Sequence, residues 1–161
     1  MSWLDRRTFL ALPFALSACG FRPANSPGGG AGRLRGHVLA ADPGDRNGFD
    51  FVGRIEERLG RPEAPLYQLT YTIQTDLHGV GLTARDRTTR QQLTGQVDYV
   101  LKDITTGSVI TSGQVHSFTG YAATGSTIAG LAAEEDAARR LMRILADQIV
   151  TRLLASAANG G

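Results

Sequence analysis

A long run of alternating side chains constrains this chain more than any other feature of the sequence. In residues 67–77 the odd positions are mostly apolar and the even positions are all polar, which is the pattern of a β-strand with one buried face. The same parity returns in residues 93–101, and residues 109–118 form a third strand-like stretch whose alternation is poorer after Gly113. Because a turn-forming segment over residues 103–108 joins the last two stretches, the three predict an antiparallel meander.

Apolar residues recur at helical spacing before the first of these strands. The spacing from Phe51 to Leu59 predicts a short helix of about three turns, with Asp45 or Asn47 as the candidate N-cap and Gly60 just past the end. Residues 34–40, further towards the N-terminus, are apolar enough for one more strand.

A second, longer helix is predicted from Ser126 or Thr127 to about Ala157. Its polar side carries as many acids as bases, which favours packing on a sheet over lying on a membrane surface. Its apolar stripe consists of Ala138, Leu141, Leu145, Ile149 and Leu153. The oppositely charged pairs expected four residues apart on its solvent side are Glu135 with Arg139, Asp136 with Arg140, and Arg143 with Asp147.

The element order is therefore β-α-β-β-β-α, which predicts an α+β fold with a four-stranded, mainly antiparallel sheet. Four strands about 4.8 Å apart make a sheet of about 20 Å, and two helices each about 10 Å across cover only one of its faces. We expect both helices on that one face and a single domain over residues 34–158.

The other face of the sheet is expected to be polar and mostly uncharged. Such a face hydrogen-bonds either to water or to another protein, and both possibilities stay open at this point. Strands of about eleven residues run to roughly 36 Å, which is comparable to the thickness of a bilayer core. The residues expected on this open face are Gln68, Thr70, Thr72, Gln74, Gln92, Thr94 and Gln96.

The N-terminus has the pattern of a lipoprotein export signal. Residues 1–18 contain Arg6 and Arg7, a short apolar run and small residues, and residues 16–19 read Leu-Ser-Ala-Cys, which resembles a lipobox. Cys19 is then the site of diacylglycerol attachment and N-acylation, although an ordinary signal with a nearby or buried thiol is the alternative. Residues 19–33 are expected to form the acylated N-terminus and a glycine-rich linker. The paired arginines also resemble a twin-arginine export motif.

Charge and motif content argue against several function classes. The chain has 17 basic and 15 acidic side chains, of which two basic and one acidic lie in the signal, so the mature body is nearly neutral and nucleic-acid binding is not expected. His37, His78 and His116 are far apart in the sequence, and no carboxylate stands at metal-ligand spacing from any of them. We expect no catalytic site, no metal site and no cofactor besides the acyl chains on Cys19.

Three arginines cluster in the connection between the two most regular strands. Guanidinium groups bind phosphate oxygens in a bidentate manner, so this strand connection is a candidate for binding a phosphorylated ligand. A charged loop that merely stays solvated is the alternative. The three residues are Arg85, Arg87 and Arg90.

Residues 19–23 read Cys-Gly-Phe-Arg-Pro, which resembles the Cys-Gly-Phe-x-Pro start of mature LptE, the LPS-assembly lipoprotein family. The strand beginning at Tyr67, the Thr-Gly hairpin at residues 106–107, Tyr121 and the alanine-rich final helix follow in the order that this family has. The resemblance covers nearly all of the mature chain and implies a four-stranded sheet backed by two helices.

The resemblance further implies a non-enzymatic protein of the outer membrane, anchored by lipid on its periplasmic side. The family's role is to plug the LptD-type β-barrel, assist assembly of that barrel and help deliver lipopolysaccharide to the outer leaflet. On this basis the open sheet face is a candidate barrel-facing surface, and the three arginines are candidate lipopolysaccharide-binding residues. The alternative is a free periplasm-facing lipoprotein that binds a small amphiphile or tethers the envelope.

Overall fold

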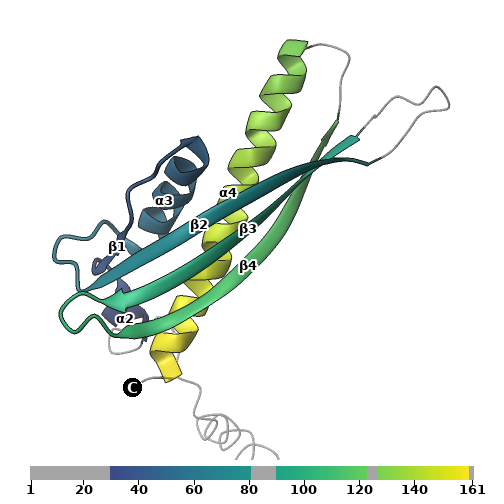
Figure 1. Cartoon of the computed structure of the whole chain (residues 1–161). Coiled ribbons are helices and arrows are strands. Elements are labelled where there is room, and N and C mark those ends of the chain that lie inside the picture. The colour runs from purple at the N-terminus through teal and green to yellow at the C-terminus, as the bar shows by residue number, and fades with distance from the viewer. Residues whose placement is uncertain (1–29, 81–89, 123–126, 160–161) are drawn as a thin grey trace, which may run out of the picture.

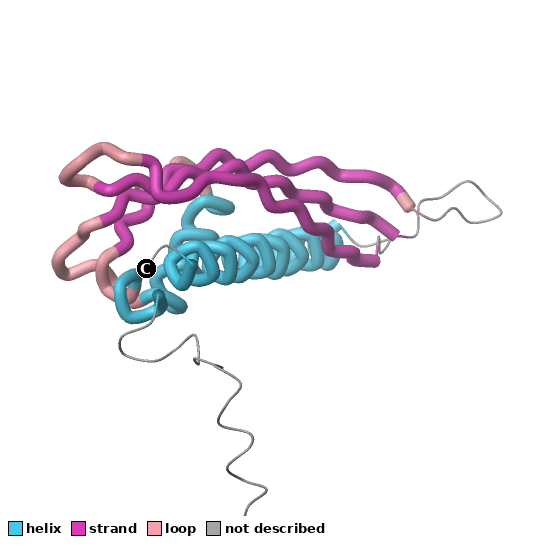
Figure 2. Tube along the Cα trace, turned by 90° about the horizontal axis from the view of Figure 1, so that it is seen from below, coloured by secondary structure: helices cyan, strands magenta, loops and turns pink. Residues whose placement is uncertain are grey.

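The computed structural model describes residues 30–80, 90–122 and 127–159, which form one sheet with its helices (Figure 1). The strand order is β1-β2-β3-β4, with β1 parallel to β2 and the other neighbours antiparallel. Figure 2 shows the helices on one face of the sheet. The predicted fold class and element order are confirmed, with one short helix added at the start. The elements are α2 (Gly30–Leu34), β1 (Val38–Ala40), α3 (Arg46–Leu59), β2 (Tyr67–Gly79), β3 (Arg90–Asp103), β4 (Val109–Ala122) and α4 (Thr127–Asn159).

The odd and even positions of β2 and β3 lie on the faces that the sequence predicts, and these strands are longer than the sequence pattern indicates. The register joins Leu69 to Leu101 and Ile73 to Val97, so odd positions of β2 and β3 share the helix-covered face. Leu69, Val97 and Leu101 are fully buried there. At about 3.3 Å per residue, β2 extends over about 43 Å.

A register shift interrupts the pairing of β3 with β4 at Leu101 and Lys102. Because Ile110 is the extra residue, the bulge reverses which face the later residues of β4 occupy, and it lies before Gly113. The alternation after Gly113 is hard to read because the polar residues Ser117 and Thr119 lie on the helix-covered side, whereas apolar Phe118 lies on the open side. Beyond the bulge the register is regular, with Val97 opposite Val115 and Gln91 opposite Tyr121.

The N-terminal part of the domain differs from the prediction of a strand over residues 34–40 that follows a flexible linker. Residues 30–34 are helical, and only Val38–Ala40 is a strand. Two interactions with the C-terminal part of α4 account for the helix. Leu34 is buried in the core, and Arg33 donates a hydrogen bond to the carbonyl oxygen of Ala157 at 2.6 Å. Gly36, with φ of 70°, makes the turn into β1.

α3 begins and ends where the capping residues predict. Asp45 is the N-cap, and its carboxylate accepts a hydrogen bond from the backbone N–H of Gly48 at 2.7 Å. Gly60 ends the helix with φ of 82°. Phe51 on its buried side lies against Tyr71 of β2, with ring centroids 4.8 Å apart.

α4 lies along the sheet and supplies much of the core. Four of the five residues of its predicted stripe are fully buried, and Ala138 is partly buried. Its 33 residues extend over about 50 Å, long enough to follow the strands along most of their length. The further buried residues on this helix are Ala137, Met142, Ala146 and Val150.

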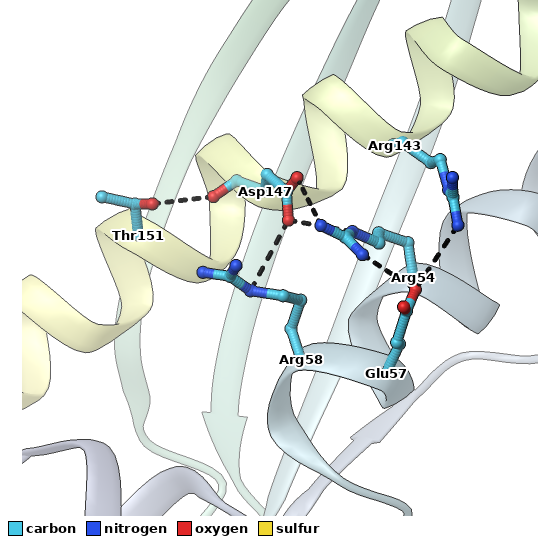
Figure 3. A network of polar contacts seen from close by, with 6 residues as sticks. All are labelled: Arg54, Glu57, Arg58, Arg143, Asp147 and Thr151. Carbon is cyan, nitrogen blue, oxygen red and sulfur yellow. Dashed lines mark hydrogen bonds and ion pairs between the residues drawn. The ribbon is translucent and has the colours of Figure 1, made fainter. Parts of the chain in front are cut away.

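The predicted charge pairs of α4 are mostly replaced by pairs with α3 (Figure 3). Only Asp136 with Arg140 forms as expected, at 2.9 Å. Asp147 instead receives a two-pronged hydrogen bond from Arg54 at 3.0 and 2.9 Å, and Arg143 lies 3.8 Å from Glu57. Where an arginine of α3 lies close enough to a carboxylate of α4, it pairs with that carboxylate in place of the arginine four residues along α4. A bidentate arginine–carboxylate pair is stronger than an exposed pair along one helix.

In the same way Glu135 pairs with Arg46 of α3 at 3.5 Å rather than with Arg139. These ion pairs link α3 to α4.

Candidate functional site

The open face of the sheet brings together the seven polar residues that the alternation assigns to it. Gln74 lies opposite Gln96 and Thr72 lies opposite Asp98, so even positions of β2 and β3 form continuous rows across the sheet. The helices lie on the opposite face (Figure 2). All four of the β2 residues in this set are exposed, and the three of β3 are partly exposed because neighbouring strands flank them.

β4 contributes a third row to this face, which sequence reasoning missed. Gln114 lies opposite Asp98, His116 opposite Gln96, and Phe118 opposite Thr94. The poor alternation after Gly113 hid these residues, although pairing the strands outward from the hairpin with an allowance for one bulge would have assigned them.

Phe118 is the most apolar feature of the open face. Its side chain is 63% exposed, and it lies beside a hollow of about 230 Å³ lined also by Gln74, Gln96 and His116. An exposed aromatic side chain surrounded by amides and hydroxyls is typical of an anchor residue in a protein interface.

Asp98 is a carboxylate near the middle of the open face and is held by its neighbours. One oxygen accepts a hydrogen bond from Gln114 at 2.7 Å, and the other accepts one from Gln96 at 3.3 Å. It borders a second shallow hollow of about 410 Å³ over Thr70, Thr72 and Ser112. The face can therefore form many neutral hydrogen bonds, with its charge confined to a few positions.

Arg90 is the described member of the predicted arginine cluster. It begins β3 opposite Ala122, at the end of the sheet far from the β3–β4 hairpin, and it is exposed. Its carbonyl oxygen accepts a hydrogen bond from the backbone N–H of Val80 at 2.8 Å. Arg85, Arg87 and Cys19 lie outside the described residues.

The three histidines are not brought together. His37 donates through Nδ1 to the carbonyl oxygen of Ala64 at 2.8 Å, whereas His78 and His116 are exposed on different strands of the open face. In residues 30–80, 90–122 and 127–159, no group of three His, Cys, Asp or Glu side chains could hold a metal ion. Within the same residues, no helix is both long and apolar enough to cross a membrane.

Tyr71 and Asp103 are among the side chains with shifted pKa values, and both lie away from the open face. The hydroxyl of Tyr71 is buried without a hydrogen-bond partner, and burial raises its pKa, helped by the negative charges of Asp45 and Asp42. Backbone N–H groups of Thr106 and Thr105 donate to the carboxylate of Asp103 and lower its pKa, although partial burial opposes them. Asp103 thereby closes the β3–β4 hairpin, and both groups have structural explanations.

Several solved lipoprotein structures share this fold. One from Caulobacter crescentus has a TM-score of 0.67 at 20% identity, covering 80% of this chain and 96% of that chain. The rare lipoprotein B from Shewanella oneidensis has a TM-score of 0.58 at 11% identity, with coverages of 76% and 96%. A minor lipoprotein from Acinetobacter baumannii has a TM-score of 0.53 at 17% identity, with coverages of 74% and 89%. Identities this low establish the fold alone.

The fold and the one-sided sheet thus define a class of α+β domains found in bacterial lipoproteins. No curated protein matches the sequence. The LptE family, described as Lipopolysaccharide-assembly, matches residues 24–153, which is most of the chain. The protein belongs to the LptE lipopolysaccharide-assembly family.

Proposed function

We propose that this protein is an outer-membrane lipoprotein, anchored through acylated Cys19 on the periplasmic side, that plugs an LptD-type β-barrel and assists its assembly. It acts without catalysis, as a packing and guiding subunit in the transport of lipopolysaccharide to the outer leaflet. Membership of the LptE family supports the role in lipopolysaccharide assembly.

The observation that carries the plug proposal is the open face itself. A sheet of long strands with helices on one side presents three rows of hydroxyls and amides, with Phe118 standing out among them. The inner wall of a large barrel is polar, and neutral hydrogen-bonding groups match such a wall at little desolvation cost. Charged groups would lose more solvation energy on docking than they recover.

The test is copurification of the full-length lipoprotein in a gentle detergent. A stoichiometric, heat-modifiable barrel in the eluate is the expected result, and a lipoprotein eluting alone would favour the free, amphiphile-binding or envelope-tethering alternative. Cys19→Ala tests the anchor separately, because no other thiol can accept diacylglycerol. Labelling with radioactive palmitate should fall to background in this variant, and persistent label would contradict the lipobox interpretation.

We also propose that Arg85, Arg87 and Arg90 contact the phosphates of lipopolysaccharide. Arg90 supports this by its exposed position at the far end of the sheet, where a substrate can reach it. Changing all three arginines to Glu should abolish lipopolysaccharide binding at fixed ionic strength without unfolding the domain. Unchanged affinity would narrow the role to plugging and assembling the barrel.

A further inference from the structure

The two outer edges of the sheet are protected differently. Along β4, side chains of α4 reach backbone carbonyls that point away from β3. Arg152 donates to the carbonyl oxygen of Gln114 at 2.5 Å, and Gln148 donates to that of His116 at 3.4 Å. Side chains that occupy edge carbonyls prevent another strand from pairing there.

The β2 edge has a paired neighbour only over its first three residues, Tyr67–Leu69, which pair with β1. The N–H of Tyr67 donates to His37, and the carbonyl of Leu69 accepts from Ala41, so odd-numbered backbone groups point to this edge. Because the register with β3 continues to Gly79 without a shift, the same alternation holds further along the strand. The N–H and C=O groups that point away from β3 are therefore those of Tyr71, Ile73, Thr75 and Leu77.

Within the described residues, no strand pairs with the outer edge of β2 beyond Leu69. The chain leaves β1 at Ala40 and continues through residues 42–45 into α3. Figure 1 shows β2 continuing well past the end of β1. This part of β2 has N–H and C=O groups without a partner strand, and such an edge can pair with the backbone of a further strand.

A cavity of about 270 Å³ lies next to this edge, between α3, α4 and the sheet. Leu93, Leu131 and Ala138 give it apolar walls, and Thr75 of the edge strand itself lines it. Leu131 is 59% exposed and Leu77 is 46% exposed, so apolar surface remains uncovered here. Side chains of an added strand that point to the helix side would enter this space, because successive side chains alternate between faces.

The surroundings of the edge are acidic. The cavity is lined by Asp50, Glu134 and Glu135, against the single cation Arg46, which already pairs with Glu135 at 3.5 Å. Asp76 is exposed on the other side of the same strand. This charge favours a basic occupant and disfavours a phosphorylated one.

We propose that the β2 edge over Tyr71–Leu77 docks an extended, basic, amphipathic segment of a partner protein, which adds to the sheet as a fifth strand. Main-chain hydrogen bonds to the outward groups hold the segment, its apolar side chains fill the cavity, and the negative charges of Asp50, Asp76 and Glu134 around the edge attract its Lys or Arg side chains. This surface is distinct from the open sheet face, and the proposal stands independently of the plug function.

The experiment uses the full-length lipoprotein in detergent micelles. The probe is a fluorescein-labelled peptide, acetyl-Lys-Val-Lys-Ile-Arg-Val-Thr-Leu-amide, followed by fluorescence anisotropy, with an analogue that carries Glu in place of every Lys and Arg. We expect saturable binding of the basic peptide, at least ten-fold weaker binding of the acidic analogue, and slowed amide exchange at Ile73 and Thr75 in the complex.

Two pairs of variants test the two parts of the proposal. Thr75→Pro removes an outward N–H without removing a bond to β3, and it should weaken binding at least ten-fold, whereas Thr75→Val keeps the N–H and should bind like the wild type. Glu134→Lys should weaken binding several-fold, whereas the same charge change at exposed Glu63, outside the cavity, should not. The charge pair does not depend on the proline variant folding.

Several outcomes would overturn the proposal. These are no binding of the basic peptide, equal binding of the acidic analogue, or undiminished binding by Glu134→Lys or by folded Thr75→Pro. Sedimentation velocity that shows a dimer of the lipoprotein, lost in Thr75→Pro, would assign the edge to a second copy of the chain instead. Displacement of the peptide by lipid vesicles without protein would assign the cavity to an acyl chain.

Discussion

The two faces of the sheet are built from the same strands, yet one forms the core and the other a surface. On the helix side, Leu69, Val97 and Leu101 are fully buried under α3 and α4. On the open side, residues of the same strands such as Thr72 and Gln74 are exposed and polar. Because side chains alternate with a period of two, each residue belongs to one face only. Folding stability and recognition are therefore separable by mutation.

The largest expected effect is on the buried face. Leu141→Ala removes a fully buried side chain of α4 and should lower the free energy of unfolding by about 2–5 kcal/mol, through lost burial and the cavity that remains. Thr72→Val, at an exposed position of the open face, should change it by no more than about 0.5 kcal/mol. Urea denaturation of both variants measures the difference. Similar losses in the two would contradict the division of labour between the faces.

Two glycines offer a smaller and sharper comparison. A Cβ added at Gly95 would lie 2.9 Å from Cδ2 of Leu141. A Cβ added at Gly120 would have the carbonyl oxygen of Gln91 as its nearest neighbour, at 3.6 Å. Gly95→Ala should destabilise the domain by about 1–3 kcal/mol through overpacking. Gly120→Ala should be nearly neutral, because that contact is an ordinary one. Thermal unfolding of the pair tests this, and an equally stable Gly95→Ala would show that α4 packs more loosely than the distances indicate.

The ion pairs between the helices are expected to contribute less. Asp147→Ala removes both hydrogen bonds from Arg54, whose side chain is only 20% exposed, and should cost about 1–2 kcal/mol. Asp136→Ala, which breaks an exposed pair within α4, should cost less than about 0.5 kcal/mol. Equal costs measured by denaturation would mean that the contact between α3 and α4 rests on apolar packing alone.

Acidic pH should weaken the ion pair between Arg54 and Glu57 within α3. The Arg54 guanidinium lowers the pKa of Glu57 below its ordinary value of 4.5. The stabilisation from this pair is fully present above that ordinary value and is lost as the pH falls through the lowered value of the folded state. Glu57→Gln should therefore make the stability less dependent on pH in this acidic range. An unaltered profile in Glu57→Gln would assign the acid sensitivity to other carboxylates, such as Asp103.

Local patterns in the sequence predict most of the fold. The alternation of residues 67–77 and the caps Asp45 and Gly60 depend on neighbours along the chain, and the structure confirms them. The parallel pairing of β1 with β2, the bulge at Leu101 and Lys102, and the helical residues 30–34 depend on partners far away in the sequence. No local pattern indicates them.

The candidate site follows the same rule. The rows from β2 and β3 could be assigned in advance, because their register contains no irregularity. Phe118 and Gln114 are missed without an allowance for the bulge, which reverses the face of every later residue in β4, and polar Thr119 on the covered face hides the alternation beside Phe118. Glu135 and Asp147 formed pairs with α3 that replace those expected along α4, since helix packing places a competing arginine within reach.

The most direct test of the central claim is the double variant Thr72→Arg with Gln96→Arg, made in the full-length lipoprotein and copurified with its barrel. Both residues lie on the open face, away from the core, so the free energy of unfolding should change by no more than about 0.5 kcal/mol. If this face docks against the barrel wall, two desolvated guanidinium groups, of which Asp98 can neutralise only one, should reduce the yield of complex to a small fraction of that of the wild type. An equal yield of complex with and without the arginines would contradict the account and identify the open face as a solvated surface.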